Sequence, residues 1–254
     1  MEPLRKPLQG VTNIIRFNWH FYVLAFIALA GILFYAPFLN PAYIPYVEIF
    51  TALATLSIIL SLAVSWYVYD GSALYSLRWM DSIKIQEGTT IVNINAGFDE
   101  TSALVQHKFP NATIIVFDFY DAAKHTEVSI KRARKAYPAF PGTTAITTTK
   151  IPLADASADR ILLTLAAHEI RADEERTVFF KELQRILKPG GQVLVTEHLR
   201  DLPNFLAYNI GSFHFFSKAT WLHTFTASGF NVLQEQKHTP FITTFILEKY
   251  AATS

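Results

Sequence analysis

The chain has 254 residues, enough for one good-sized domain with a smaller element beside it. Half of the residues are hydrophobic (51%), only 17% are charged and the mean hydropathy is +0.23, whereas an ordinary soluble domain carries about 25% charged residues. This composition excludes disorder and disfavours a purely cytosolic protein. A formal net charge of +1 leaves no basic field for a nucleic-acid partner, and the absence of cysteine excludes disulfides, thiolate metal sites and a cysteine nucleophile.

Two long apolar segments, residues 21–38 and 49–68, carry no charged side chain. Each is about as long as a helix that spans roughly 30 Å of hydrocarbon. Two prolines break the short segment between them, and aromatic residues gather at the segment ends, as at membrane interfaces. A buried helical pair or a signal peptide is the alternative, although no cleavage site follows. The sequence thus predicts an N-terminal arm and transmembrane hairpin over residues 1–70, followed by a second domain over 71–254.

The basic residues predict how the hairpin is oriented. Arg5, Lys6 and Arg16 precede the first apolar segment, Arg78 and Lys84 follow the second, and the connecting loop has no Lys or Arg. The positive-inside rule therefore places both termini and the second domain in the cytoplasm, with the hairpin in the cell inner membrane and the lipid bilayer as a partner. Homo-oligomerisation stays open.

Beyond residue 71, strand-like and helix-like patterns alternate. An amphipathic helix is expected over 72–83, and Asp99 or Thr101 can cap a helix that runs to Lys108. The other expected helices lie near 127–135, at 173–188 and at 220–228, and the expected strands at 90–95, 113–117, 143–149, 159–165, 192–196, 230–236 and 241–248. The alternation indicates a parallel sheet covered by helices on both faces. The last two strands are joined too closely for a crossover, so they must be antiparallel.

The order of motifs over about residues 75–248 resembles that of the class I, Rossmann-like S-adenosylmethionine-dependent methyltransferases. It looks most like their small-molecule branch, which includes quinone and lipid methyltransferases. The motifs are 91–97 with Asp118, the Ile-Pro-containing run 151–159, the Ala-His-Glu-Ile of 167–170, and 183–191 with its Lys-Pro-Gly-Gly turn. The resemblance implies a seven-stranded, mostly parallel α/β sheet with an antiparallel last strand.

The same resemblance implies S-adenosylmethionine as the cofactor. The glycine loop of this chain departs from the family pattern, because residues 93–99 keep only Gly97 of the three glycines that the family pattern has there. Asp118, at the end of the second strand, is expected to accept hydrogen bonds from the ribose hydroxyls; a helix-capping role is the alternative, and a nicotinamide cofactor would use the same geometry. The expected cofactor-binding residues are Asn93, Asn95, Ala96, Gly97, Asp118, Phe119, Thr149 and Ala166. A cavity filled by side chains such as Phe98 would contradict an enzyme.

Two titratable pairs follow neighbouring strands. His168 and Glu169 come after the fourth strand, and Glu197 and His198 after the fifth, so both pairs are expected at one edge of the sheet. His168, Glu169 and His198 are the candidate catalytic residues, with His168 as base or acceptor-orienting group. The aromatic stretch 199–221 is expected to contribute to the acceptor pocket, although a core helix would explain it almost as well. The expected residues of the acceptor pocket are Tyr120, Glu197, Tyr208 and His214. No metal site is expected, since the histidines are scattered in the sequence.

These observations favour a membrane-anchored methyltransferase that acts on a lipid-soluble acceptor: a lipid headgroup, a quinone or a lipid-tailed aromatic. Tethering the enzyme to the bilayer would raise the effective concentration of such an acceptor. A second hypothesis is a catalytically degenerate, methyltransferase-like membrane interaction module, motivated by the reduced glycine loop. A third is an anchored enzyme with a water-soluble acceptor.

Overall fold

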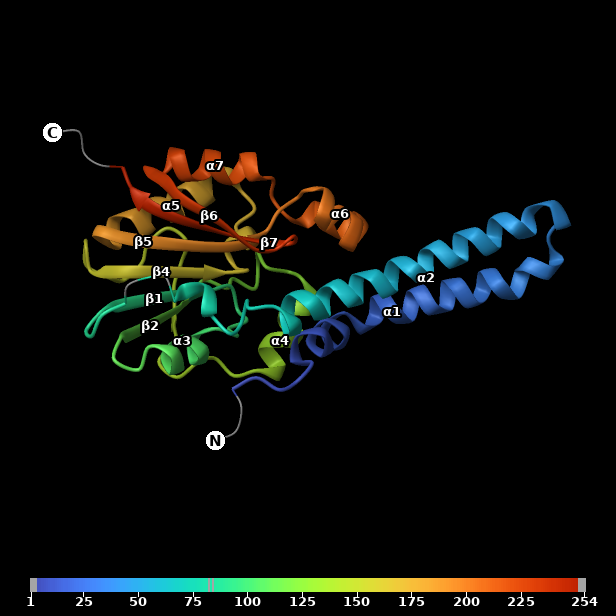
Figure 1. Ribbon diagram of the computed structural model, residues 1–254, viewed down its shortest axis with the longest axis horizontal. Coiled ribbons are helices and arrows are strands. Elements are labelled where there is room, and N and C mark those ends of the chain that lie inside the picture. Colours follow the sequence, from blue (N-terminus) through green and yellow to red (C-terminus); the bar gives the residue numbers. More distant parts are fainter. Residues whose placement is uncertain (1–3, 82, 84, 251–254) are drawn as a thin grey trace.

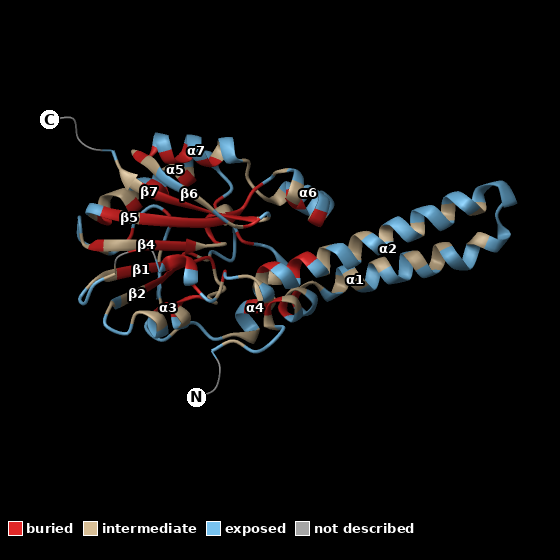
Figure 2. Cartoon of the chain, viewed as in Figure 1, coloured by how far each residue is buried: buried red, intermediate tan, exposed pale blue. Residues whose placement is uncertain are grey.

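A computed structural model describes residues 4–81, 83 and 85–250, and it consists of a long helical hairpin attached to an α/β domain (Figure 1). The hairpin helices are α1 (Gln9–Tyr35) and α2 (Ile44–Trp66), joined through two short 3-10 turns, η1 (Ala36–Phe38) and η2 (Pro41–Tyr43). Both helices are long and apolar enough to cross a membrane, and only 6% of each apolar stretch is buried. Figure 2 shows the outer part of the hairpin as a mixture of exposed and half-buried residues, and buried residues at its inner end beside the domain.

The helix α1 begins at Gln9, twelve residues before the predicted apolar segment. Its first turns are amphipathic, because Gly10, Asn13 and Phe17 are buried at a spacing of three to four residues. Non-helical dihedral angles at Asn18 then kink the helix (φ −113°, ψ 17°). The kink separates an inner end that packs on the domain from an outer, wholly apolar rod. After α2 a π-helical turn, η3 (Tyr67–Gly71), leads into the domain.

The domain is built on a seven-stranded sheet in the order β3-β2-β1-β4-β5-β7-β6. The strands are β1 (Thr90–Asn95), β2 (Thr113–Asp118), β3 (Thr144–Ala145), β4 (Ala158–Thr164), β5 (Leu187–His198), β6 (Phe230–Thr239) and β7 (Ile242–Lys249). The first five strands are parallel, and β7 pairs antiparallel with both β5 and β6. This arrangement confirms the predicted Rossmann-like α/β fold with a reversed last strand.

Helices cover both faces of the sheet (Figure 1). They are α3 (Ser102–Lys108), α4 (Val128–Ala136), α5 (Asp173–Ile186), α6 (Leu202–Tyr208) and α7 (Lys218–Ala227), with the 3-10 turns η4 (Arg78–Met80), η5 (Ala167–Glu169) and η6 (Asn209–His214). The central strands are buried on both faces, which explains their runs of β-branched residues. The largest core cluster packs β4 and β5 against Phe179, Phe180 and Leu183 of α5.

Three local predictions need correction. The expected helix over 72–83 is a series of turns with only η4, because Leu77 adopts a left-handed conformation (φ 53°) and the Ser72 hydroxyl bonds to backbone groups; residue 82 lies outside the described residues. The strand expected over 143–149 is reduced to Thr144–Ala145. The Pro-Gly-Gly of 189–191 lies within β5 rather than in a turn before it, because α5 already ends at Ile186.

Candidate functional site

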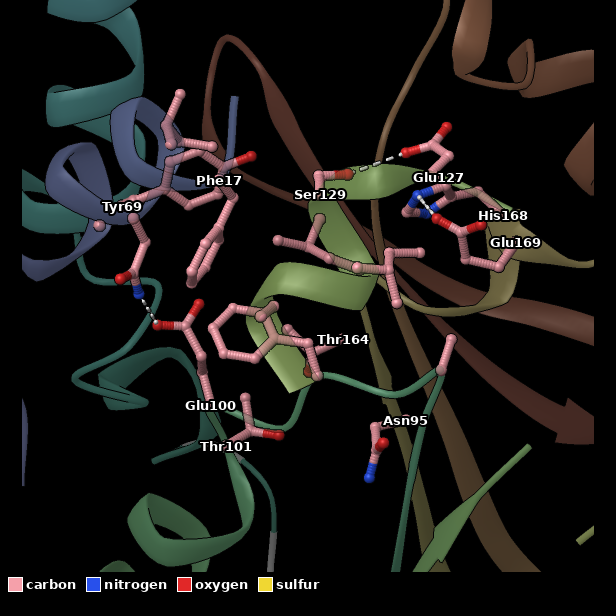
Figure 3. A pocket seen from close by; sticks show the side chains of 18 of the residues that line it. Phe17, Tyr69, Asn95, Glu100, Thr101, Glu127, Ser129, Thr164, His168 and Glu169 are labelled. Carbon is pink, nitrogen blue, oxygen red and sulfur yellow. Dashed lines mark hydrogen bonds and ion pairs between the residues drawn. The ribbon is translucent and has the colours of Figure 1, made fainter. Parts of the chain in front are cut away.

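A cavity of about 280 Å³ lies where the carboxyl ends of β1 and β4 meet the inner end of the hairpin (Figure 3). Asn95 and Ala96 line it from the end of β1, and Thr164 and Leu165 from the end of β4. This position is the one at which open α/β sheets bind ligands. The opposite wall comes from the hairpin and consists of Gly10, Asn13, Ile14, Phe17, Asn18 and Tyr69. Two distant parts of the chain therefore build one cavity.

Polar contacts fix the hairpin wall to the domain. The Asp70 carboxylate accepts hydrogen bonds from the N–H groups of Gly10 and Val11, both at 2.8 Å, and so caps the start of α1. Arg5 forms an ion pair with Glu100 at 2.7 Å (Nη1 to Oε1), with both side chains nearly buried. The hydroxyl of Tyr137, just after α4, donates to Asn13 at 2.9 Å. These contacts hold the first turns of α1 in a defined place over the sheet edge.

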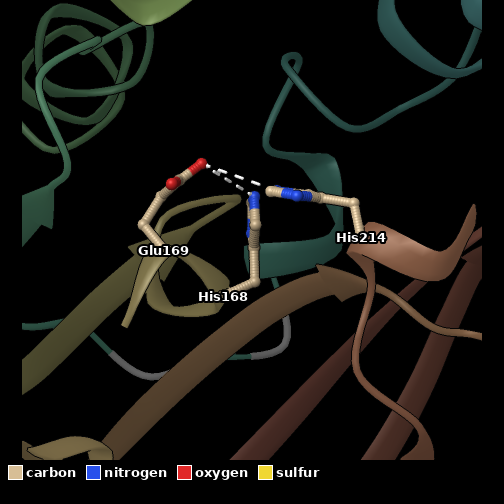
Figure 4. Close-up of side chains that lie close together, drawn as sticks. All are labelled: His168, Glu169 and His214. Atoms are coloured by element: carbon tan, nitrogen blue, oxygen red, sulfur yellow. Dashed lines mark ion pairs between the residues drawn. The ribbon is translucent and has the colours of Figure 1, made fainter. Parts of the chain in front are cut away.

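The sheet edge also carries the predicted pair His168–Glu169 on η5, and both residues line the cavity. The His168 Nδ1 lies 2.7 Å from Oε2 of Glu197, whose other oxygen accepts the His168 backbone N–H at 3.2 Å. Glu197 is fully buried, so it can hold the imidazole in one orientation. His214 of η6 joins the group, with its ring 5.1 Å from that of His168 (Figure 4). The expectation that the histidines are too scattered to meet is therefore wrong for His168 and His214.

Electrostatics in this group favour charge on both partners. Burial alone would lower the pKa of His168, but the Glu197 and Glu169 carboxylates outweigh it and raise that pKa to about 10. Burial likewise opposes ionisation of Glu169, yet hydrogen bonds from His168 and His214 hold its pKa well below the usual range. Without a further ligand, His168 is an imidazolium at neutral pH. It can donate a hydrogen bond to an acceptor more readily than it can remove a proton.

His198, the third candidate catalytic residue, does not line the cavity. It is buried at the end of β5, where its Nδ1 donates to Asn204 (2.9 Å) and its Nε2 accepts from the Tyr69 hydroxyl (2.8 Å). The Phe215 ring stacks on it at 4.6 Å. Burial lowers the pKa of His198 to about 4, so the ring is neutral. His198 thus supports the base of the hairpin instead of facing a substrate.

The reduced glycine loop keeps one polar group available to a ligand. Asn95 lines the cavity, and its Oδ1 accepts a hydrogen bond from the Gly97 N–H. The Nδ2 of Asn95 is buried and has no hydrogen-bond partner among the described residues. Gly97 has φ +97°, and an added Cβ would come within 3.0 Å of Tyr120 and Arg134, so this position requires glycine. Phe98 packs edge-on against Phe17 (5.7 Å) and lines the cavity without filling it.

Asp118 ends β2 as predicted but does not line the cavity. It accepts the Tyr120 N–H at 2.8 Å and forms an ion pair with Arg134, whose guanidinium lies 4.3 Å above the Tyr120 ring. A carboxylate has about four lone-pair sites, so two of them remain for ribose hydroxyls. The free Asn95 amide group therefore fits the methionine part of S-adenosylmethionine, and the two remaining lone-pair sites of Asp118 fit the ribose hydroxyls, with Arg134 and Tyr120 lying against that carboxylate in this structure.

The other predicted site residues lie away from the cavity. Asn93 binds the hydroxyls of Thr101 and Ser102 with its amide nitrogen, which ties β1 to α3. Phe119 and Ala166 are core residues, and Thr149 is exposed and bonds to Thr147. Of the four expected acceptor-pocket residues, only His214 lines the cavity. The others are placed as follows: Tyr120 covers Gly97, Glu197 lies behind His168, and Tyr208 packs on His198.

Sequence reasoning missed the polar residues that come from outside the family motifs. Glu127, just before α4, lies 3.3 Å from His214 (Oε1 to Nδ1). Glu100 joins Arg5, and its other oxygen accepts the Tyr75 hydroxyl at 2.9 Å. Asn13 and Tyr69 belong to hairpin helices that were read for hydrophobicity alone. The spacing of Gly10, Asn13 and Phe17, which places a polar residue on one face with a glycine and an aromatic ring, was the available signal.

Comparisons with known proteins agree with this geometry. Residues 96–195 match the family model described as a methyltransferase domain. The fold is similar to the crystal structure of a SAM-dependent methyltransferase from Aquifex aeolicus, with 15% identity and a TM-score of 0.51 over 71% of this chain and 94% of that one. None of the curated proteins compared with the chain matches it.

Two further solved structures are similar at a TM-score of 0.50. One is the putative methyltransferase in a complex with the Haloferax volcanii Trm112 activator (14% identity; 72% of this chain and 95% of that one). The other is an O-methyltransferase family 2 protein from Planctomyces limnophilus in complex with apigenin (15% identity; 77% and 61%). At these identities the likeness concerns the fold, whereas the family model matches residues 96–195. This segment matches a methyltransferase domain, the enzyme is an S-adenosylmethionine-dependent methyltransferase, and S-adenosylmethionine is its cofactor.

Proposed function

We propose that the protein is a membrane-anchored methyltransferase whose acceptor is lipid-soluble. Residues 1–70 anchor it as a transmembrane hairpin, and 71–254 form the catalytic domain. The observation that carries this proposal is the shared cavity: Asn13, Phe17 and Tyr69 of the hairpin face Asn95 and His168 of the sheet edge. An acceptor with an apolar tail can lie along the hairpin while its polar group enters the cavity.

A second apolar surface flanks the hairpin and supports the same proposal. It is the α6–η6 segment, residues 202–214, whose exposed side chains are Leu202, Phe205, Leu206, Ile210 and Phe213. Asn209 in this segment donates to the Ser57 hydroxyl at 2.7 Å, and Ser57 lies within the expected span 49–68. If the hairpin spans the bilayer as proposed, the segment lies beside the span, and its exposed apolar side chains are suited to insertion at the interface.

The charge pattern gives the orientation that we propose. Arg5, Arg16 and Arg78 lie at the domain end of the hairpin, and the loop at its far end, residues 39–45, has no Lys or Arg. Lys6 lies at the same end, and Lys84, the fifth residue used for this prediction, lies outside the described residues. With the positive end inside, both termini and the catalytic domain are cytoplasmic, at the inner membrane.

The chain's own residues supply binding and orientation. When bound, S-adenosylmethionine supplies an electrophilic methyl group on a sulfonium, and the Asn95 amide and the Asp118 carboxylate would hold it. His168, Glu169 and His214 would position the polar group of the acceptor at the other side of the cavity, because they are the titratable residues grouped there. Phe17 and Phe98 would exclude water from the space between.

Comparative mass spectrometry of lipid extracts tests the proposed acceptor class. Cells that express the wild-type gene should contain a lipid-soluble species heavier by one methylene unit than in deletion cells or in cells with the Asp118→Ala variant. If only water-soluble metabolites differ, the acceptor is soluble and the third hypothesis replaces this one. The full chain in vesicles should also turn over an acceptor embedded in the bilayer faster than a short-chain soluble analogue.

Calorimetry of the detergent-solubilised protein measures whether S-adenosylmethionine binds. The result distinguishes the enzyme from the second hypothesis, a catalytically degenerate membrane interaction module. Asp118→Ala should weaken S-adenosylmethionine binding by about 10- to 100-fold, the usual cost of losing hydrogen bonds to a charged group. Arg134→Ala should strengthen binding, because it frees Asp118 from its ion pair. Absence of binding to the wild-type protein would support the interaction module.

A further inference from the structure

The group formed by His168, Glu169 and His214 has the composition of a metal site. Their ligand atoms all lie within 4.8 Å of one another, and the Nε2 atoms of both histidines face the same carboxylate oxygen, Oε1 of Glu169, at 3.3 and 3.7 Å. Two donors bound at the usual zinc distances in a tetrahedron lie about 3.3–3.5 Å apart. We propose that these three residues bind a divalent transition metal ion, with Zn²⁺ the best match to two imidazoles and a carboxylate.

Both histidines are oriented as metal ligands usually are. His168 Nδ1 is held by the buried Glu197 at 2.7 Å, and His214 Nδ1 lies 3.3 Å from Glu127. Metal-binding histidines commonly place a carboxylate on the ring nitrogen that does not bind the metal. Glu127 is itself held by the Ser129 hydroxyl at 3.2 Å. Both Nε2 atoms are thereby turned toward the same Glu169 carboxylate oxygen (Figure 4).

The local charge also calls for a cation. Three carboxylates, from Glu127, Glu169 and Glu197, surround the two imidazole rings. Among the described residues, the cation that bridges this group is Arg171, which donates to the backbone oxygens of His168 and His214 at 3.0 and 2.7 Å. With neutral imidazoles, the three carboxylates and Arg171 sum to a charge of −2, which one divalent ion neutralises.

The metal would lie in the wall of the cavity, with three protein ligands and an open side. All three ligand residues line the cavity, and their side chains are only 13%, 11% and 31% exposed. Three protein ligands with a free position are the arrangement of catalytic rather than structural zinc sites. This last step rests on the proposed function: the free position would bind a hydroxyl or phosphate oxygen of the acceptor and lower the pKa of a bound hydroxyl.

Metal binding to the full chain in detergent tests the site without any assay of activity. After removal of metal with a chelator, titration with Co²⁺ should give a saturable visible absorption at one ion per chain, and Zn²⁺ should abolish it. Glu169→Gln and His214→Gln should each weaken Co²⁺ binding by at least about tenfold, and Glu197→Gln by about 10- to 100-fold. The matched control is His223→Gln, which removes an exposed histidine of α7 and should change nothing.

Two results would overturn the site: no saturable Co²⁺ signal with the wild-type chain, or equal Co²⁺ affinity in the wild type and the ligand variants. Calorimetry with S-adenosylmethionine on the same samples separates this outcome from failure of the proposed function. A chain that binds S-adenosylmethionine but no metal keeps its methyltransferase role, with an imidazolium–carboxylate group in place of the ion. Retained S-adenosylmethionine binding in Glu169→Gln also shows that this variant is folded.

Discussion

The two ends of the helical hairpin differ in composition and in surroundings. Its outer part, from Phe21 to Leu60, exposes large apolar side chains, and among the described residues its polar contact with the domain is the hydrogen bond from Asn209 to Ser57. Its inner end buries Asn13, carries Asp70 and Tyr69, and forms one wall of the cavity. The outer part needs a solvent that accepts hydrocarbon, whereas the inner end depends on specific packing. Substitutions at the two ends should therefore differ sharply in their cost.

The largest difference is expected between two glycines of α1. Gly10→Val should lower the free energy of unfolding by about 3 kcal/mol, because even a Cβ at Gly10 would overlap the Cβ of Tyr69 and crowd Asp70. Gly31→Val, on the outer part, should stay within about 0.5 kcal/mol, since a Cβ there meets nothing within 4 Å. Thermal unfolding in detergent measures both. Equal losses would mean that the inner end is not packed as described.

The second-largest effect is expected from acidification, which should lower the free energy of unfolding through the inner end of the hairpin. His198, which accepts the Tyr69 hydroxyl, has its pKa lowered to about 4 by burial, against about 6.5 in an unfolded chain. Its contribution to stability is therefore complete above pH 6.5 and is lost as the pH falls toward 4. Between pH 6.5 and 4.5 this loss is roughly 2–3 kcal/mol.

Unfolding experiments across this pH range measure the contribution of His198, but a second histidine must be separated from it. Burial also lowers the pKa of His238 to about 4, so both histidines destabilise the fold in acid. A His238→Gln variant should retain the part due to His198, and His198→Gln should retain the part due to His238. If His198→Gln unfolds with the same pH dependence as the wild type, His198 is not held neutral at the hairpin base.

A smaller loss of stability is expected when Asp70, which caps the start of α1, is replaced. Asp70→Ala should cost about 1–2 kcal/mol, the usual loss when a carboxylate no longer caps a helix N-terminus. Glu48→Ala is the control, because Glu48 is exposed near the far end of α2. Chemical or thermal unfolding compares the two. A Glu48 effect as large as that of Asp70 would contradict the assignment of special packing to the inner end.

The smallest effect concerns the contact between α1 and α4. Arg132 lies 2.8 Å from His20 (Nη1 to Nδ1) and 5.4 Å from the Trp19 ring. Arg132→Gln should cost less than about 1 kcal/mol, because the contact is only partly buried. Lys135→Gln removes the same charge from an exposed position of α4 and serves as the control in unfolding and vesicle-binding experiments. If Lys135→Gln alone reduces binding to anionic vesicles, α4 contacts lipid through Lys135 instead.

The sheet could be predicted from the sequence because its signals are local. The run Thr90–Asn95 is β-branched and buried, and the close spacing of the last two strands allows only an antiparallel pair. The segment 72–83 could not be predicted in the same way. Its helix-like pattern is overridden by the left-handed Leu77 and by the Trp79 side chain, whose Nε1 bonds to the Leu74 carbonyl.

The candidate site was harder to predict from the sequence than the sheet, because its contacts join residues that lie far apart in the chain. His168 and Glu169 were placed at the correct edge by the order of the strands. Their neighbour His214 lies on η6, 45 residues after Glu169, and Asn13 lies on α1, eight residues before the segment predicted to span the membrane. Asp118 was placed correctly at its strand end, but its ion pair with Arg134 depends on how α4 packs.

The shared cavity has a consequence for the biogenesis of this enzyme. A newly made chain whose first helix has not yet reached its place on the domain has a cavity with one wall missing. Acceptor binding would then begin only after the N-terminal segment has folded onto the sheet edge. Assembly of the hairpin and maturation of the catalytic cavity would be one event.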